Sequence, residues 1–176
     1  GAFTIAAGAA GTQAASFQSQ MQNVGTLLDG DVQGKLQGMS KQLKQVSIDT
    51  GAATSDLTDG LYQVVSAFGE SAESVKQLEI AAKAAKAGNA TTTDSVNMLS
   101  AVTKGYGDTS AAALQKASDL AFLTVKLGQT SFPELASSMG QVVPLAATMK
   151  VSQEELFGAM ATLTGVTGGT AEVTTQ

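Results

Sequence analysis

Glycines that follow apolar, helix-like stretches constrain the fold of this chain more than any other feature. Gly69, Gly88, Gly107 and Gly128 each come after such a stretch, as glycines at helix C-termini do, because they adopt left-handed backbone angles without strain. The segments between them are rich in Ala, Leu, Gln, Lys and Glu, and strictly alternating β-branched runs are missing. The sequence therefore predicts an all-α fold of short helices with no sheet.

Apolar residues spaced three and four positions apart locate the helices, as Leu61, Val64 and Phe68 illustrate. We expect a compact bundle of short helices and helical hairpins. It is divided into an N-terminal helical segment with Gly-rich breaks, residues 1–50, and a helical core module, residues 51–176. The expected helices cover residues 12–28, 32–49, 54–68, 71–87, 93–106, 109–127, 131–149 and 152–165.

Two capping boxes mark helix starts in the last third of the chain. Ser131 with Glu134, and Ser152 with Glu155, have the spacing at which the serine hydroxyl and the glutamate carboxylate satisfy each other's backbone N–H groups. Pro144 lies inside a helical pattern. Because proline lacks a backbone N–H, we expect it to kink or split that helix.

A weak internal repeat relates two stretches of the chain at an offset of 38 residues. Each stretch would form a helix, a glycine turn and a second helix. Two such units are fewer than the three that make a repeat array convincing, so helical hairpins are the main expectation and a duplicated unit is the alternative. The aligned residues are Asp56, Leu61, Val64, Phe68, Gly69 and Ser71 with Asp94, Leu99, Val102, Tyr106, Gly107 and Thr109.

The composition excludes most kinds of catalytic and metal site. The chain has no Cys and no His, which excludes disulfides, thiol nucleophiles, imidazole bases and the usual zinc sites. A net charge of −5 without a basic stripe disfavours nucleic-acid binding. The apolar N-terminal run GAFTIAAGAAG is short of the ~20 residues of a membrane-spanning helix. We expect no enzyme activity, catalytic residue, cofactor, metal, small-molecule substrate or transmembrane span.

The acidic and glycine-containing motifs have structural explanations. The segment 30–36, GDVQGKL, resembles a phosphate-binding loop, but it has one residue too few between the glycines and Leu36 at the magnesium-binding position. The carboxylate pair Glu154 and Glu155 lies at an expected helix start. There it complements the partial positive charge of the helix N-terminus.

One glycine pattern suggests a contact between helices. Gly30, Gly34 and Gly38 recur every four residues, so in a helix they share one face on which another backbone could approach closely. The alternative is a flexible or broken segment, because a glycine inside a helix costs about 1 kcal/mol relative to alanine. We take these three residues as the candidate site for helix–helix contact.

The stretch TSFPELASSMGQVVPLAATMKVSQEELFGAMATLTG, residues 130–165, resembles the core region of phage tail tape measure proteins. The matching pattern is a Thr/Ser-rich turn, a Glu-Leu helix start, a segment ending in Pro144, a Val-Ser-x-Glu-Glu-Leu helix and a Leu-Thr pair. Further segments are similar to the same family: 15–28 (ASFQSQMQNVGTLL), 59–69 (DGLYQVVSAFG), 81–88 (AAKAAKAG) and 101–107 (AVTKGYG).

The resemblance implies a structural virion protein that sets tail length and organises tail-tube assembly. It implies partners among tail-tube, tail-tip or baseplate and tail-assembly chaperone proteins, self-association, and a location in the tail-tube lumen after assembly in the host cytoplasm. Members of the family are longer, and Gly1 has no preceding Met, so we expect this chain to be a fragment. Because the segments are short, we expect it to act as a folded docking or self-association module.

Two alternatives come from other functional classes. A small helical binding module unrelated to tails would explain the composition, and it predicts a complete small protein. A cell-wall hydrolase is the second alternative, because some tape measure proteins carry such domains, but the missing His and Cys disfavour it here.

Overall fold

The computed structural model describes residues 2–175, with side chains described for residues 14–171, 173 and 174. All regular structure in this range is helical, and no strand occurs in it. The predicted all-α class of short helices is confirmed. The helices are α1 (Ala2–Gly25), α2 (Val32–Thr50), α3 (Thr54–Phe68), α4 (Ser74–Gly88), α5 (Thr92–Gly105), α6 (Ala111–Leu127), α7 (Phe132–Thr148), α8 (Gln153–Thr167) and α9 (Thr170–Thr175).

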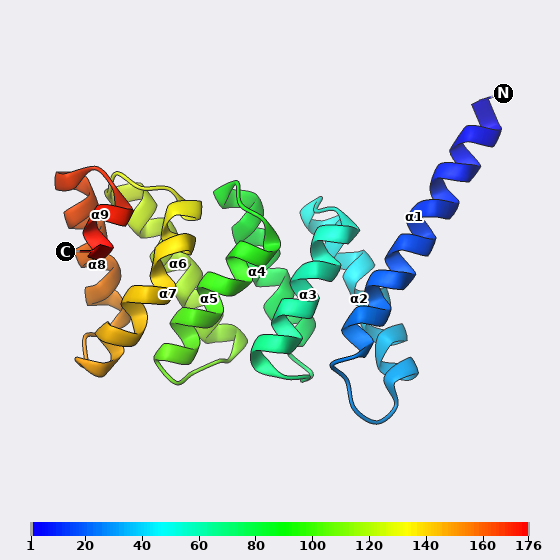
Figure 1. Ribbon diagram of the computed structural model, residues 1–176, viewed down its shortest axis with the longest axis horizontal. Helices are drawn as coiled ribbons and strands as arrows, with labels where there is room; N and C mark the ends of the chain where they lie inside the picture. The colour runs from blue at the N-terminus through cyan, green and yellow to red at the C-terminus, as the bar shows by residue number, and fades with distance from the viewer. Residues whose placement is uncertain (1, 176) are drawn as a thin grey trace.

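The helices are stacked in two layers along a row (Figure 1). The odd-numbered helices follow one another in one layer and the even-numbered helices α2 to α8 in the other. Each helix packs against the next helix of its own layer, and nearly all also pack against their chain neighbours. Helical hairpins therefore repeat through the molecule, as the 38-residue offset suggested, and more of them are stacked than the two units aligned in the sequence.

One apolar core runs between the layers, from Met21 in α1 to Met160 in α8. Burying a leucine side chain contributes about 1.5–3 kcal/mol, so this continuous row is the main source of stability. The fully buried leucines come from six successive helices: Leu43, Leu57, Leu61, Leu78, Leu99, Leu114 and Leu135.

Local capping signals fix the starts of α7 and α8. Ser131 and Ser152 each accept a hydrogen bond from the backbone N–H of the glutamate three residues on, and that glutamate binds back to the serine N–H. Both predicted capping boxes are confirmed. The start of α1 was placed too late, because its helix begins at Ala2 rather than residue 12, and α9 was not expected.

The expected break at Pro144 does not split α7. The helix continues unbroken from Phe132 to Thr148 with Pro144 inside it. The carbonyl that Pro144 leaves without a helical partner belongs to Gly140, four residues earlier. Both residues lie on the exposed side of the helix, so water can hydrate that carbonyl, and Gly140 offers no side chain to the proline ring.

Two carboxylates cap helices other than their own. Asp56, in the first turn of α3, accepts hydrogen bonds from the hydroxyl and the backbone N–H of Thr92 at the start of α5, the latter at 3.1 Å. Glu73, at the start of α4, accepts from the backbone N–H of Ala111 at the start of α6, also at 3.1 Å. Each carboxylate thus complements the partial positive charge at the N-terminus of the next helix in its own layer. In this way it ties neighbouring hairpins together.

Candidate functional site

The segment that resembles a phosphate loop forms the start of α2. Asp31 is the N-cap, and its carboxylate accepts from the Gly34 N–H at 3.0 Å. The Lys35 ammonium donates to the Asp29 carbonyl at 2.6 Å and to the Glu70 carboxylate at 2.5 Å. The lysine is therefore engaged within the chain, and this geometry is that of a helix cap rather than of a phosphate cradle.

The carboxyls with perturbed pKa values are held ionised by donors. A hydrogen bond from Lys83 lowers the pKa of Glu79, and one from Lys116 lowers the pKa of Glu154. The backbone N–H of Ser152 lowers the pKa of Glu155. Each shift moves the carboxyl away from the near-neutral pKa that suits a general acid or base. Within residues 2–175, no three acidic side chains gather where a metal ion could be held.

The structure separates the three glycines predicted to share a helix face. Gly30 lies before α2 in the left-handed region, at φ +72°, while Gly34 and Gly38 lie on the exposed side of α2. A Cβ at Gly38 would meet nothing within 4 Å, and the nearest atoms to one at Gly34 belong to the capping carboxylate of Asp31. Among the described residues, no close contact between helices passes through Gly34 or Gly38. A contact with another chain at Gly34 and Gly38 stays a prediction.

Close contacts between helices occur instead at other glycines. Two of these, Gly88 and Gly128, were expected only to end helices. A Cβ at Gly88 would lie 2.6 Å from the Phe132 side chain, and one at Gly128 would lie 2.9 Å from the Ala161 carbonyl oxygen. Gly60 and Gly105 are similarly tight. These contacts join residues far apart in the sequence, so no local pattern identifies them.

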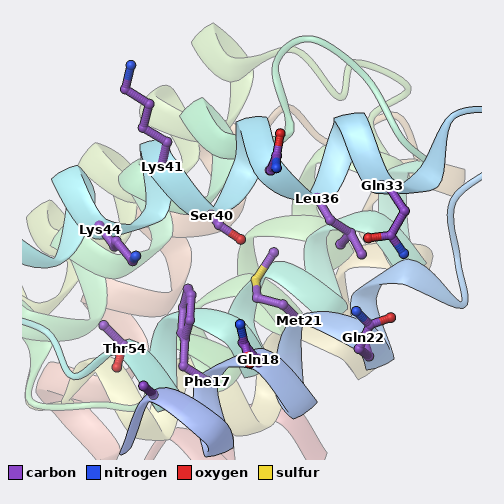
Figure 2. Close-up of a pocket in the computed structure, with 12 residues that line it drawn as sticks. Phe17, Gln18, Met21, Gln22, Gln33, Leu36, Ser40, Lys41, Lys44 and Thr54 are labelled. Carbon is purple, nitrogen blue, oxygen red and sulfur yellow. The ribbon is translucent and has the colours of Figure 1, made fainter. Parts of the chain in front are cut away.

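An open groove of about 740 Å³ lies between α1 and α2. We call it the α1–α2 groove. Figure 2 shows Phe17 and Met21 rising from α1 and Leu36 descending from α2 to form its apolar floor. The Lys44 ammonium lies 5.6 Å from the centre of the Phe17 ring, a cation–π contact. The remaining lining residues are Ala14, Gln18, Gln22, Gln33, Gln37, Ser40, Lys41 and Thr54.

A second hollow, of about 480 Å³, lies beside α1 and α3 and is polar. Its lining is mostly amide and hydroxyl groups, and Tyr62 is its one aromatic residue. The lining residues are Gln20, Asn23, Thr26, Thr58, Asp59, Tyr62, Gln63 and Thr93.

A family model described as phage-related minor tail protein matches residues 40–176. The chain belongs to this family. Among curated proteins and solved structures, none matches it. Membership supports a structural role in a phage tail and a location in the virion tail, and it points to a non-enzymatic protein with partners from tail assembly.

The match to the minor tail protein family begins inside α2. It includes the helices from α3 onward, with the cross-helix caps at Asp56 and Glu73. It leaves out α1, and with it one wall of the α1–α2 groove. Among the described residues, no helix of this minor tail protein is both long enough and apolar enough to cross a membrane.

Proposed function

We propose that this minor tail protein segment is part of a tape measure protein, which sets tail length and organises tail-tube polymerisation from within the tube lumen. The supporting observation is the coincidence of the family match over residues 40–176 with the tape-measure-like stretch 130–165, which forms α7 and α8 with both capping boxes in place. Assembly would begin in the host cytoplasm.

Within that protein, the segment serves as a folded docking or self-association module and not as the ruler. A ruler needs length per residue, and a continuous helix supplies ~1.5 Å of rise for each. Here α3 to α8 are each 14 to 17 residues long and fold back on one another. The ruler would therefore lie elsewhere in the parent protein.

The division at residue 50 belongs to the same proposal. Gly51 ends α2 in the left-handed region, at φ +68°. Residues 51–176, with α3 to α9, form the core module, and residues 1–50, with α1 and α2, form the N-terminal segment. The partners would be copies of the same chain and proteins of the tail tube, the tail tip or baseplate, and the assembly chaperones. The charged fraction of 14%, against ~25% in typical domains, supports a surface that packs against other proteins.

Measuring tail length in the parent phage tests this proposal. One in-frame deletion removes the α5–α6 hairpin, residues 91–130, and a matched deletion removes an equal number of residues outside residues 1–176. Electron micrographs should show tails shortened in proportion for the outer deletion. For the hairpin deletion they should show few tails, with no proportional shortening. Proportional shortening by the hairpin deletion would contradict the module, and unchanged length for both would contradict the tape measure role.

A further inference from the structure

Two Asp-Gly pairs occur in the chain, and the fold places them in opposite settings. Asp29 and Gly30 lie in the turn that joins α1 to α2 (Figure 1), whereas Asp59 and Gly60 lie inside α3. In such a pair the glycine nitrogen can attack the carboxyl carbon of the aspartate, because the glycine has no side chain to hinder the approach. The surroundings of each pair therefore decide whether it reacts.

In the α1–α2 turn both reacting groups are free. Asp29 and Gly30 are exposed. Among the described residues, neither the Asp29 carboxylate nor the Gly30 N–H has a hydrogen-bond partner. A Cβ at Gly30 would meet nothing within 4 Å, so the space around the nitrogen is open. The two groups can therefore meet without breaking a contact.

The pair in α3 is protected by its helix. Inside an α-helix the N–H of Gly60 donates to the carbonyl of Asp56, four residues earlier. Gly60 is also buried, and even a Cβ added to it would collide with the Thr92 side chain. Attack on the Asp59 carboxyl would require this turn of α3 to unwind. Asp59 is therefore an internal control for Asp29 in the same molecule.

A lysine also contacts the peptide group that would react. The Lys35 ammonium donates to the Asp29 carbonyl oxygen at 2.6 Å, and the Glu70 carboxylate holds the same ammonium at 2.5 Å. The Asp29 carbonyl and the Gly30 nitrogen belong to one conjugated peptide group. When this nitrogen loses its proton, negative charge reaches the carbonyl oxygen, where the ammonium stabilises it. The contact thus makes the Gly30 nitrogen a better nucleophile.

We propose that Asp29 is a site of spontaneous backbone isomerisation to isoaspartate, promoted by Lys35. In the first step the Gly30 nitrogen forms a bond to the Asp29 Cγ. The proton of the nitrogen and the hydroxyl of the carboxyl group leave together as water, and a cyclic imide remains.

In the second step water opens the imide. It adds to the former main-chain carbonyl carbon of Asp29, which the Lys35 ammonium polarises. The bond from this carbon to the Gly30 nitrogen breaks, and the nitrogen takes a proton from the water. The main chain then runs through Cγ and is longer by the Cβ methylene, and the new free carboxylate lies beside Lys35. Opening at Cγ restores aspartate. The reaction needs no partner, so it is independent of the tape measure role.

Peptide mapping of the purified chain after prolonged incubation at neutral pH tests this proposal. A protease that cuts before aspartate does not cut before isoaspartate, so mass spectrometry detects the product as a peptide that is left uncut. In the folded chain this product should accumulate at Asp29 and not at Asp59. In urea both sites should react, because α3 is unfolded. Equal reaction of both sites in the folded chain, or no reaction at Asp29, would overturn the proposal.

Variants of the lysine contact test the part of Lys35. Lys35→Met should slow the reaction at Asp29 about tenfold, because it removes the charge-assisted donor. It should also lower the ratio of isoaspartate to aspartate formed from the imide, which a merely structural role would not change. Lys35→Arg keeps the charge and should react at nearly the wild-type rate. Glu70→Gln is the matched control, since it removes the ion pair and leaves the donor to Asp29 in place. An unchanged rate and ratio in Lys35→Met, or an equal loss in Glu70→Gln, would overturn the role of Lys35.

Discussion

The N-terminal pair, α1 and α2, and the helix array, α3 to α8, differ in the contacts that hold their helices together. In the array, several glycines lie where helices meet, as Gly88 does against Phe132. In the pair, Gly34 and Gly38 face solvent. The array also fastens its hairpins with carboxylates, such as Asp56 on α5, while α1 has no charged side chain.

This difference indicates that close internal contacts fix the helices of the array, whereas the pair leaves the α1–α2 groove open between its helices. Phe132 in the array is 1% exposed and stacks on Phe122 with ring centres 5.0 Å apart. Phe17 in the pair is half-buried at the groove. The following substitutions test this contrast, in order of decreasing expected effect.

The largest effect is expected at the array's buried phenylalanine. Phe132→Ala should lower the free energy of unfolding by about 3–5 kcal/mol, because it removes a fully buried ring and leaves a cavity. Phe17→Ala, measured on dilute chain, should cost about 1 kcal/mol, since less apolar area is lost. Urea unfolding followed by circular dichroism measures both. Equal losses of unfolding free energy would show that Phe17 and Phe132 are packed alike.

The second effect concerns the tight glycine contact. Gly88→Ala should destabilise the chain by about 1–3 kcal/mol, as overpacking does, because the added Cβ would lie 2.6 Å from Phe132. Unfolding midpoints in urea check it. A neutral Gly88→Ala variant would mean that α4 and α7 have room to separate.

The cross-helix cap gives the third prediction. Asp56→Ala should cost about 1–2 kcal/mol, because it removes the acceptor for the Thr92 N–H. Asp59→Ala is the matched control on α3, and as an exposed position it should change stability by less than about 0.5 kcal/mol. Hydrogen exchange at residues 92–94 should accelerate in the Asp56 variant alone. An equal response to both substitutions would contradict the role of Asp56 as the cap of α5.

A stabilising change is expected in the N-terminal pair. Gly38→Ala should raise the free energy of unfolding by about 0.5–1 kcal/mol, because alanine is the better helix former and its Cβ would meet nothing within 4 Å. Thermal unfolding of the dilute chain measures this. If Gly38→Leu leaves self-association of the chain unchanged, the predicted close contact with another chain at Gly38 is wrong.

The smallest expected effect is a loss of stability at acidic pH. The backbone N–H of Ser152 holds the pKa of Glu155 below its ordinary value of 4.5. The contribution of this cap is therefore complete above pH 4.5 and is lost as the pH falls through the lowered pKa. Glu155→Gln should flatten the fall in melting temperature below that pH. A wild-type-like fall in the variant would assign the acid sensitivity to other carboxyls.

Features set by neighbouring residues were predictable from the sequence, and features set by distant ones were not. The capping boxes at Ser131 and Ser152 each depend on four adjacent residues, so the spacing of serine and glutamate was sufficient to predict them. The cap that Asp56 provides to α5 and the contact of Gly88 with Phe132 depend on how the layers stack, which no local pattern contains. The glycine pattern at Gly30 failed as a helix face because Asp31 starts α2 one residue later.

The candidate groove was missed for the same reason. Its floor combines Phe17 and Met21 with Leu36, and only the folding of α2 back along α1 brings these side chains together. The heptad-like spacing of residues 14, 17, 21 and 24 was a usable signal for α1. A groove beside this helix was not predicted.

Hydrogen–deuterium exchange of the wild-type chain at low and high concentration tests the central contrast most directly. The account predicts that α3 to α8 exchange slowly at both concentrations, because their packing is internal. It predicts that the first half of α1, which projects past the other helices (Figure 1), exchanges faster than they do. A first half of α1 that exchanges as slowly as α3 to α8 in the dilute chain would contradict the account.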